Sequence, residues 1–132
     1  MFYRFLASQT GFAFAALRIV SGLLFSIHGM QKILGVLPMK EMSELPNFPS
    51  QMWFGGIIEL VAGLMIALGV YVPYAAFIAS GTMAVAYIQF HWNFQFDRNF
   101  FPVINHGELA LLYSFLFLFI ACRSAAKTQK SA

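Results

Sequence analysis

Four apolar segments, each about as long as a membrane-crossing helix, constrain the fold of this chain more than any other feature. A helix rises about 1.5 Å per residue and the hydrocarbon layer is about 30 Å thick, so a span needs about 20 mostly apolar residues. The segments that meet this length lie at about 12–37, 52–70, 73–91 and 103–122. The sequence therefore predicts an all-α, polytopic membrane protein with the lipid bilayer as its solvent.

The composition agrees with a membrane protein. Hydrophobic residues make up 60% of the chain and charged residues only 10%, whereas soluble domains have about 25% charged residues. We therefore interpret the net charge of +3 as a sign of membrane orientation and expect no nucleic-acid partner. The single cysteine, Cys122, excludes an internal disulfide and a Cys-x-x-C exchange site, so any thiol chemistry must involve another molecule.

The connections between the spans predict how the helices follow one another. Between the second and third spans, Gly69 can end one helix and Pro73 can begin the next, which predicts a tight antiparallel hairpin. Segment 38–51 is rich in proline and charge, which suits a solvated loop, and 92–102 is interpreted as an aromatic loop at the lipid headgroups. We expect residues 1–132 to form one domain, an antiparallel four-helix transmembrane bundle whose polar tail after Cys122 is disordered.

The basic residues predict the orientation, because Lys and Arg accumulate on the cytoplasmic side of a membrane. Four spans place both ends of the chain on one side. That side collects Arg4, Arg123, Lys127 and Lys130. The opposite side holds Lys40 and Arg98 beside three acids, which are Glu41, Glu44 and Asp97. Both termini should therefore be cytoplasmic.

Ionisable residues within the spans are the candidate functional residues, because such residues are rare in membranes and usually face the bundle interior. Six of them are predicted in the outer half of the membrane: His28, Lys32, Glu59, His91, His106 and Glu108. Arg18 lies nearer the cytoplasmic end. At about 100° per residue, Arg18 and Lys32 share a glycine-containing stripe with His28 at its flank, and Glu59 lies on a similar stripe of the second span.

Two interpretations of this polar group remain open. It could be a buried ion-pair network that fixes helix packing, or a pocket for a polar or redox-active small molecule, which the number of histidines and glutamates favours. Lys32 is the first choice of partner for Glu59 and Arg18 the second. A metal site is disfavoured, because the His and Glu residues lack the Glu-x-x-His spacing of di-iron bundles. Haem ligation by His28 and His106 is geometrically feasible.

Three segments resemble, in order, the signature blocks of the DoxX family of small bacterial membrane proteins. They are LRIVSGLLFSIHGMQKILG (17–35), GIIELVAGLMIALG (56–69) and NHGELALLYSFLF (105–117). The matching positions are Arg18, Gly22, His28, Gly29, Lys32, Glu59, Gly63, Gly69, Gly107 and Glu108. The resemblance implies a four-helix bundle in the bacterial inner membrane. Relatives include the membrane subunit of an archaeal thiosulfate:quinone oxidoreductase, which makes quinone-linked chemistry on thiol or sulfur compounds the leading hypothesis.

Under this hypothesis, His28 or His106 would hydrogen-bond a quinone, and Glu59 or Glu108 would exchange protons with it. Lys32 and Arg18 would complete the binding site, and a soluble or membrane redox partner would supply electrons. Glu108 is expected to face the bundle interior within reach of His28 or Lys32. The alternative hypothesis is a non-catalytic membrane scaffold or small-molecule carrier whose polar residues serve folding and partner binding.

Overall fold

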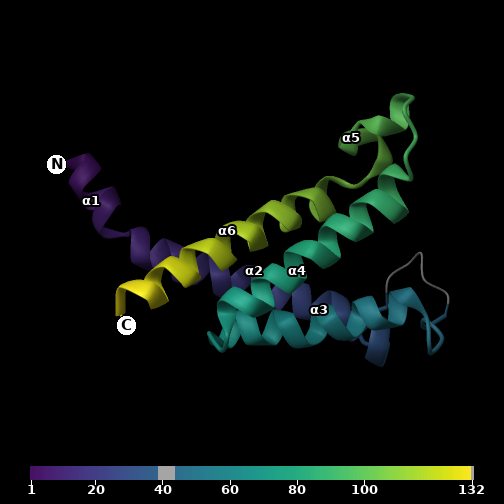
Figure 1. Ribbon diagram of the computed structural model, residues 1–132, viewed down its shortest axis with the longest axis horizontal. Helices are drawn as coiled ribbons and strands as arrows, with labels where there is room; N and C mark the ends of the chain where they lie inside the picture. The colour runs from purple at the N-terminus through teal and green to yellow at the C-terminus, as the bar shows by residue number, and fades with distance from the viewer. Residues whose placement is uncertain (39–43, 132) are drawn as a thin grey trace. The chain divides into compact units, whose positions relative to one another are not determined.

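The computed structural model describes residues 1–38 and 44–131, and every regular element in these two ranges is helical (Figure 1). In chain order, the elements are α1 (Phe2–Ser8), α2 (Thr10–Leu34), α3 (Gln51–Leu68), α4 (Val72–Ala86), the π-helix η1 (Tyr87–Trp92), the 3-10 helix η2 (Arg98–Phe100), α5 (Pro102–Asn105) and α6 (Glu108–Ser131). The predicted all-α class is confirmed. Lys40 and Glu41, which entered the orientation argument, lie outside the described residues.

In the part of the chain that the structure describes, three helices are long and apolar enough to cross a membrane: Thr10–Leu34, Gln51–Leu68 and Glu108–Lys130. They correspond to the first, second and fourth predicted spans. The third predicted span, 73–91, corresponds to α4 and η1, which follow each other without a break over 72–92. The α-helical part alone has 15 residues, which is shorter than a spanning helix requires.

The last helix differs from its predicted bounds at both ends. It begins at Glu108 rather than at 103, because His106 adopts a left-handed backbone conformation with φ of 58° and separates α5 from α6. It continues to Ser131, so the tail expected to be disordered is helical. Hydrophobicity ends at Cys122, but the following Arg, Ala, Lys and Gln residues are good helix formers, and the helix continues through them.

The chain divides into two compact units, Met1–Val70 with α1 to α3 and Tyr71–Ala132 with α4 to α6. At the end of the first unit, Gly69 closes α3 in a left-handed conformation with φ of 84°. At the start of the second, Pro73 lies in the first turn of α4. Both residues therefore occupy the positions that the sequence predicted for them.

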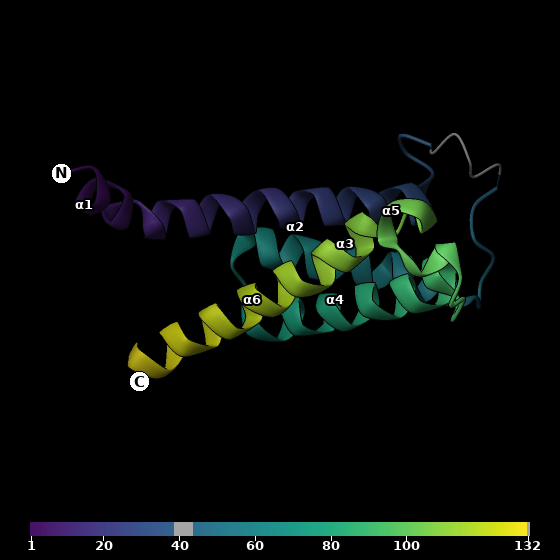
Figure 2. The same ribbon diagram turned by 90° about the horizontal axis from the view of Figure 1, so that it is seen from above.

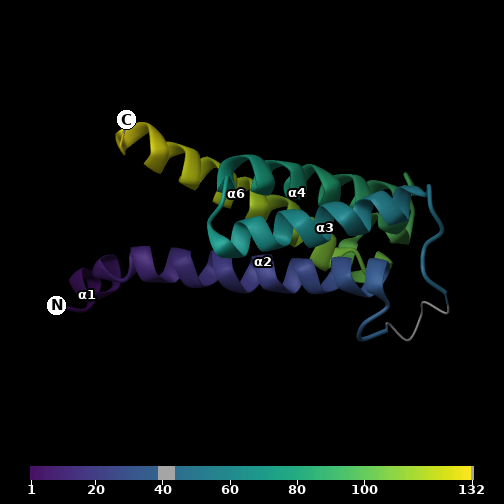
Figure 3. The same cartoon turned by 90° about the horizontal axis from the view of Figure 1, so that it is seen from below.

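In the first unit, α2 and α3 are antiparallel neighbours that meet through glycines (Figures 2 and 3). A Cβ atom added to Gly22 would lie 2.7 Å from the backbone oxygen of Gly63, and one added to Gly63 would lie 2.6 Å from the backbone oxygen of Gly22. Phe25 and Ile66 are buried. Small residues let helices approach closely in lipid, where the hydrophobic effect does not drive them together. These glycines therefore set the helix separation on which the polar contacts below depend.

In the second unit, α4 packs along α6 through small and aromatic residues. The buried residues of the two helices include Ala75, Ala76, Ala79, Ala110, Ser114, Phe117 and Ile120. The hydroxyl of Ser80 donates a hydrogen bond of 2.7 Å to the backbone oxygen of Ser114. Such a bond satisfies a polar side chain inside an apolar helix pair and fixes the register of the pair.

Candidate functional site

An ion pair joins the last turn of α2 to α3. The ammonium of Lys32 donates a hydrogen bond of 2.6 Å to Oε1 of Glu59. The Glu59 side chain is 3% exposed and that of Lys32 is 20% exposed, so the pair is buried on the carboxylate side and accessible on the ammonium side. The predicted partnership of Glu59 with Lys32, the first choice from the sequence, is confirmed.

The local sequence explains why Lys32 reaches this carboxylate. A Cβ atom added to Gly56 would lie 2.9 Å from Cβ of Lys32, so the lysine stem passes α3 where α3 has no side chain. Glu59 follows Gly56 by three residues and therefore lies about one turn further along the same face. The close glycine contact and the ion pair thus depend on one another.

The second carboxylate oxygen of Glu59 is buried without a hydrogen-bond partner among the residues that the structure describes. An ionised carboxylate offers about four acceptor positions on its two oxygens. Leaving a buried acceptor unpaired costs about 1–3 kcal/mol. Beside it, Lys32 has three ammonium hydrogens, of which one serves Oε1. The pair therefore combines an acceptor that needs a donor with an accessible cation, which suits a ligand that can both donate and accept hydrogen bonds.

Arg18 makes a different contact, at the opposite end of the same helix pair. Its guanidinium donates a hydrogen bond of 2.5 Å to the backbone oxygen of Ile66. Ile66 lies in the last turn of α3, where carbonyl groups have no partner within the helix and a cation complements the helix dipole. Arg18 thus stabilises the end of α3, whereas the carboxylate of Glu59 pairs with Lys32.

The remaining predicted residues lie on both units. His28 is half-buried on α2, one turn before Lys32. His106 and Glu108 are exposed and flank the break between α5 and α6. The contact expected between Glu108 and His28 or Lys32 would join the two units, as would a pocket shared with Glu59, and both stay predictions. The same holds for haem ligation by His28 and His106.

A hydrogen-bonded loop in the second unit was only partly visible in the sequence. Nδ1 of His91 lies 3.2 Å from the backbone oxygen of Asn105, and the Asn105 amide donates 2.8 Å to the backbone oxygen of Asn99. His91 belongs to the π-helix η1, and π-helical turns are frequent at functional sites. Rings of the loop also gather around Trp92, with ring centroids 5.3 Å away for Phe94 and for Phe96. The sequence predicted the aromatic loop, but no sequence pattern indicated the role of Asn105.

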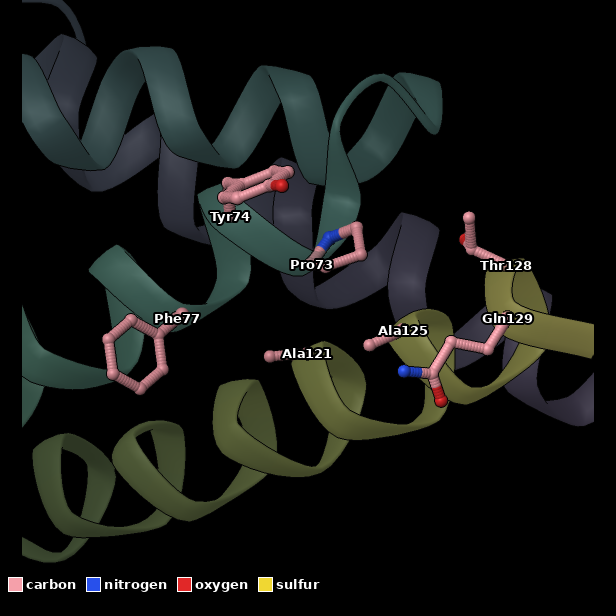
Figure 4. A pocket seen from close by; sticks show the side chains of 7 residues that line it. All are labelled: Pro73, Tyr74, Phe77, Ala121, Ala125, Thr128 and Gln129. Carbon is pink, nitrogen blue, oxygen red and sulfur yellow. The ribbon is translucent and has the colours of Figure 1, made fainter. Parts of the chain in front are cut away.

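A groove of about 470 Å³ lies between α4 and α6 in the second unit (Figure 4). Its lining is mostly apolar and consists of Pro73, Tyr74, Phe77, Ala121, Ala125, Thr128 and Gln129. None of the residues predicted as catalytic or ligand-binding contributes to it. Within the described ranges, no group of three His, Cys, Asp or Glu residues is placed to hold a metal ion. The Lys32–Glu59 pair is therefore the candidate site that the structure supports best.

His106 provides a test of whether a site residue is kept at the expense of stability. Its backbone adopts a left-handed conformation, which is unfavourable for residues other than glycine. His106→Gly should leave the free energy of unfolding unchanged or raise it by up to about 1 kcal/mol, because glycine adopts this conformation without a steric penalty. Thermal unfolding of the detergent-solubilised protein measures this change in stability. A clear loss of stability would show that the imidazole makes a structural contact.

The candidate site lies in a part of the chain that is similar to known proteins. The DoxX family profile matches residues 13–92, a range that includes Arg18, His28, Lys32 and Glu59. A Haemophilus influenzae protein described as uncharacterized is 39% identical over 112 residues, which cover 84% of this chain and 82% of that protein. No solved structure matches the chain.

Proposed function

This chain belongs to the DoxX family of membrane proteins, and we propose that it acts as the membrane subunit of a quinone-linked redox system. The observation that carries the proposal is the buried Glu59 oxygen, which has no donor among the described residues and lies beside the partly exposed Lys32 ammonium. A quinone would supply two-electron, two-proton redox chemistry at this position. The electrons would come from a soluble or membrane partner, with thiol or sulfur compounds as their source: two thiols give one disulfide, two electrons and two protons.

The roles of the residues follow from their hydrogen-bonding capacity. The Lys32 ammonium would donate a hydrogen bond to a quinone carbonyl oxygen. Oε2 of Glu59 would accept a hydrogen bond from a hydroxyl of the reduced quinone. His28, one turn from Lys32, would donate a second hydrogen bond. Arg18 would act on the same ligand only if the ligand extends along α2, because its guanidinium already caps α3. His106 and Glu108 would complete the site as a second hydrogen-bonding and proton-exchanging pair.

This function requires an arrangement in which all predicted spans cross the inner membrane. We propose that α4 and η1 form the remaining span, since 72–92 contains no Asp, Glu, Lys or Arg and is helical throughout. With α2, α3 and α6 it would complete an antiparallel four-helix bundle that forms one domain. The bundle would bring the predicted polar residues of both units to the outer half of the bilayer.

Thiol labelling tests the proposed orientation with cytoplasmic termini. In a Cys122→Ser background, cysteines introduced at Asn47 and Asn99 should react with an impermeant reagent added to intact cells, and one at Ser131 should not. The reason is the bias of basic residues toward the chain ends. Labelling of Ser131→Cys alone would reverse the orientation and place the Lys32–Glu59 pair near the cytoplasm. Labelling of all positions after cell lysis provides the control for reactivity.

Quinone binding tests the proposed chemistry directly. Short-chain ubiquinone and menaquinone are titrated into the purified protein, with tryptophan fluorescence as the readout. We expect saturable binding of at least one of them, weakened about 10–100-fold in the Lys32→Met/Glu59→Leu double variant, because hydrogen bonds to charged groups contribute about 1.5–3 kcal/mol. This variant removes both charges together and so avoids leaving one unpaired. Arg98→Gln, at an exposed position of η2, is the matched control.

Equal binding by the double variant and the unmodified protein would contradict the assignment of this site. Failure of both quinones to bind would favour the second candidate function, a membrane scaffold or carrier. The contact between Arg18 and Ile66 favours this alternative, because it shows that one of the intramembrane cations serves helix packing. Under the scaffold hypothesis, the polar residues serve folding and partner binding, so the double variant should retain its protein partners less well than the unmodified protein.

A further inference from the structure

The seven-residue helix α1 (Phe2–Ser8) precedes the first spanning helix and has two contrasting faces. At about 100° per residue, its four large apolar side chains fall within an arc of about 160°. These side chains are Phe2, Tyr3, Phe5 and Leu6. Arg4 and Ser8 lie on the opposite side. This division is the pattern of an amphipathic helix.

Within residues 1–38 and 44–131, no protein segment covers either face of α1. None of its residues is buried, and the exposed fraction is 67% for Phe2, 60% for Phe5 and 48% for Leu6. A short helix of this kind is only marginally stable in water without a surface against which it can bury its apolar side. The exposed aromatic face therefore needs an occupant.

The junction with α2 turns α1 away from the direction of the span (Figure 1). Gln9 separates the two helices, and polar side chains on both sides of it bond back to α1. The Ser8 hydroxyl donates 2.6 Å to the backbone oxygen of Phe5, and the Thr10 hydroxyl donates 2.9 Å to that of Ala7. The α2 helix is long and apolar enough to cross a membrane from Thr10 onward, so a spanning α2 would place this junction at the boundary between hydrocarbon and water.

We propose that α1 lies in the plane of the membrane surface as an interfacial anchor. Its occupant is the glycerophospholipid layer, with Phe2, Phe5 and Leu6 inserted at the boundary between headgroups and acyl chains and Tyr3 at their margin. Aromatic side chains favour this depth, and an amphipathic helix with a basic polar face binds anionic surfaces. Arg4 would lie level with the lipid phosphates. The anchor is independent of the quinone proposal, since it rests on the faces and exposure of α1 and on its junction with α2.

Spin-label accessibility along α1 tests the anchor in the full chain. In a Cys122→Ser background, single cysteines at positions 2–8 are labelled and reconstituted in phosphatidylglycerol and phosphatidylcholine vesicles. Collision with oxygen, which concentrates in lipid, is compared with collision with a water-soluble nickel chelate. We expect the oxygen-to-nickel ratio to be several-fold higher at positions 2, 5 and 6 than at 4 and 8. Labels on the exposed residues Leu23 and Leu24 of α2, which a spanning helix would present to lipid, give the reference for lipid contact.

Two outcomes would overturn the anchor. High nickel collision at all seven positions would mean that α1 stays in water. Low collision with both reagents at positions 2, 5 and 6 would mean that protein, such as a second copy of the chain, covers this face. A separate variant, Phe5→Glu, should lower the ratio at position 2 toward that of position 4 by expelling the helix from the lipid. An unchanged ratio in this variant would likewise reject an apolar anchor.

Discussion

Replacing Glu59 with glutamine should destabilise the α2–α3 unit by about 3–5 kcal/mol, because the substitution leaves the Lys32 ammonium without its countercharge. Glutamine keeps the shape of the side chain, so the loss would come from charge rather than from volume. The partial exposure of Lys32 allows some relief by snorkelling, which places the expected loss at the lower end of this range. Unfolding by denaturing detergent, followed by circular dichroism, measures the free energy.

A double-mutant cycle separates this pair from its surroundings. Lys32→Met/Glu59→Leu should cost less than the sum of Lys32→Met and Glu59→Leu, with a coupling energy of about 0.5–3 kcal/mol. The reason is that the double variant leaves no buried charge unpaired. Glu44→Gln, on an exposed part of the loop after α2, should change stability by less than about 0.5 kcal/mol. Strictly additive losses would show that Lys32 and Glu59 do not interact in the folded protein.

The parts of the candidate site that were predictable from sequence depend on helical periodicity. Gly29 and Lys32 share one stripe of α2, and Gly56 and Glu59 share one of α3, so close approach of the glycine faces places the two charges together. Within one helix, about 100° per residue fixes which side chains share a face. The all-α class and the Lys32–Glu59 pair followed from this geometry and from the lengths of the apolar segments.

The parts that were not predictable depend on backbone conformation and on helix propensity outside the apolar segments. The left-handed His106 delays the start of α6 to Glu108, and apolar residues before it concealed this break. After Cys122, propensity rather than hydrophobicity continues the helix. The predicted contact between Glu108 and residues of α2 depends on how the helices pack side by side. Many weak contacts together determine this packing, so the residues on one helix face do not predict it.

Substitution of Gly29 by alanine should also cause a large loss of stability, because Gly29 lies in the close contact between α2 and α3. An added methyl group would collide with the backbone nitrogen of Leu60 and lie 2.6 Å from the backbone oxygen of Gly56. Backbone atoms cannot rotate away as a side chain can, so the helices must separate along their glycine contact. Overpacking in a core costs about 1–3 kcal/mol. Separation would also lengthen the neighbouring Lys32–Glu59 contact, so we expect the upper end of this range, and Gly29→Leu should prevent folding.

Two other glycines on α3 turn this expectation into an ordered series. A methyl group on Gly56 would meet Lys32 Cβ at 2.9 Å, which the backbone holds in place, and Ile33 Cδ1 at 3.0 Å, which can rotate away. Gly55 has no atom of the described residues within 4 Å of the added position and is the matched control. Stability in denaturing detergent should therefore fall most for Gly29→Ala and less for Gly56→Ala. Gly55→Ala should leave it unchanged or raise it by up to about 1 kcal/mol, because alanine favours a helix more than glycine does. A loss at Gly55 equal to that at Gly29 would mean that alanine acts through the single helix rather than through the α2–α3 contact. If instead Gly29→Ala is tolerated and Gly56→Ala is not, α2 meets α3 in a register other than the one that pairs Lys32 with Glu59.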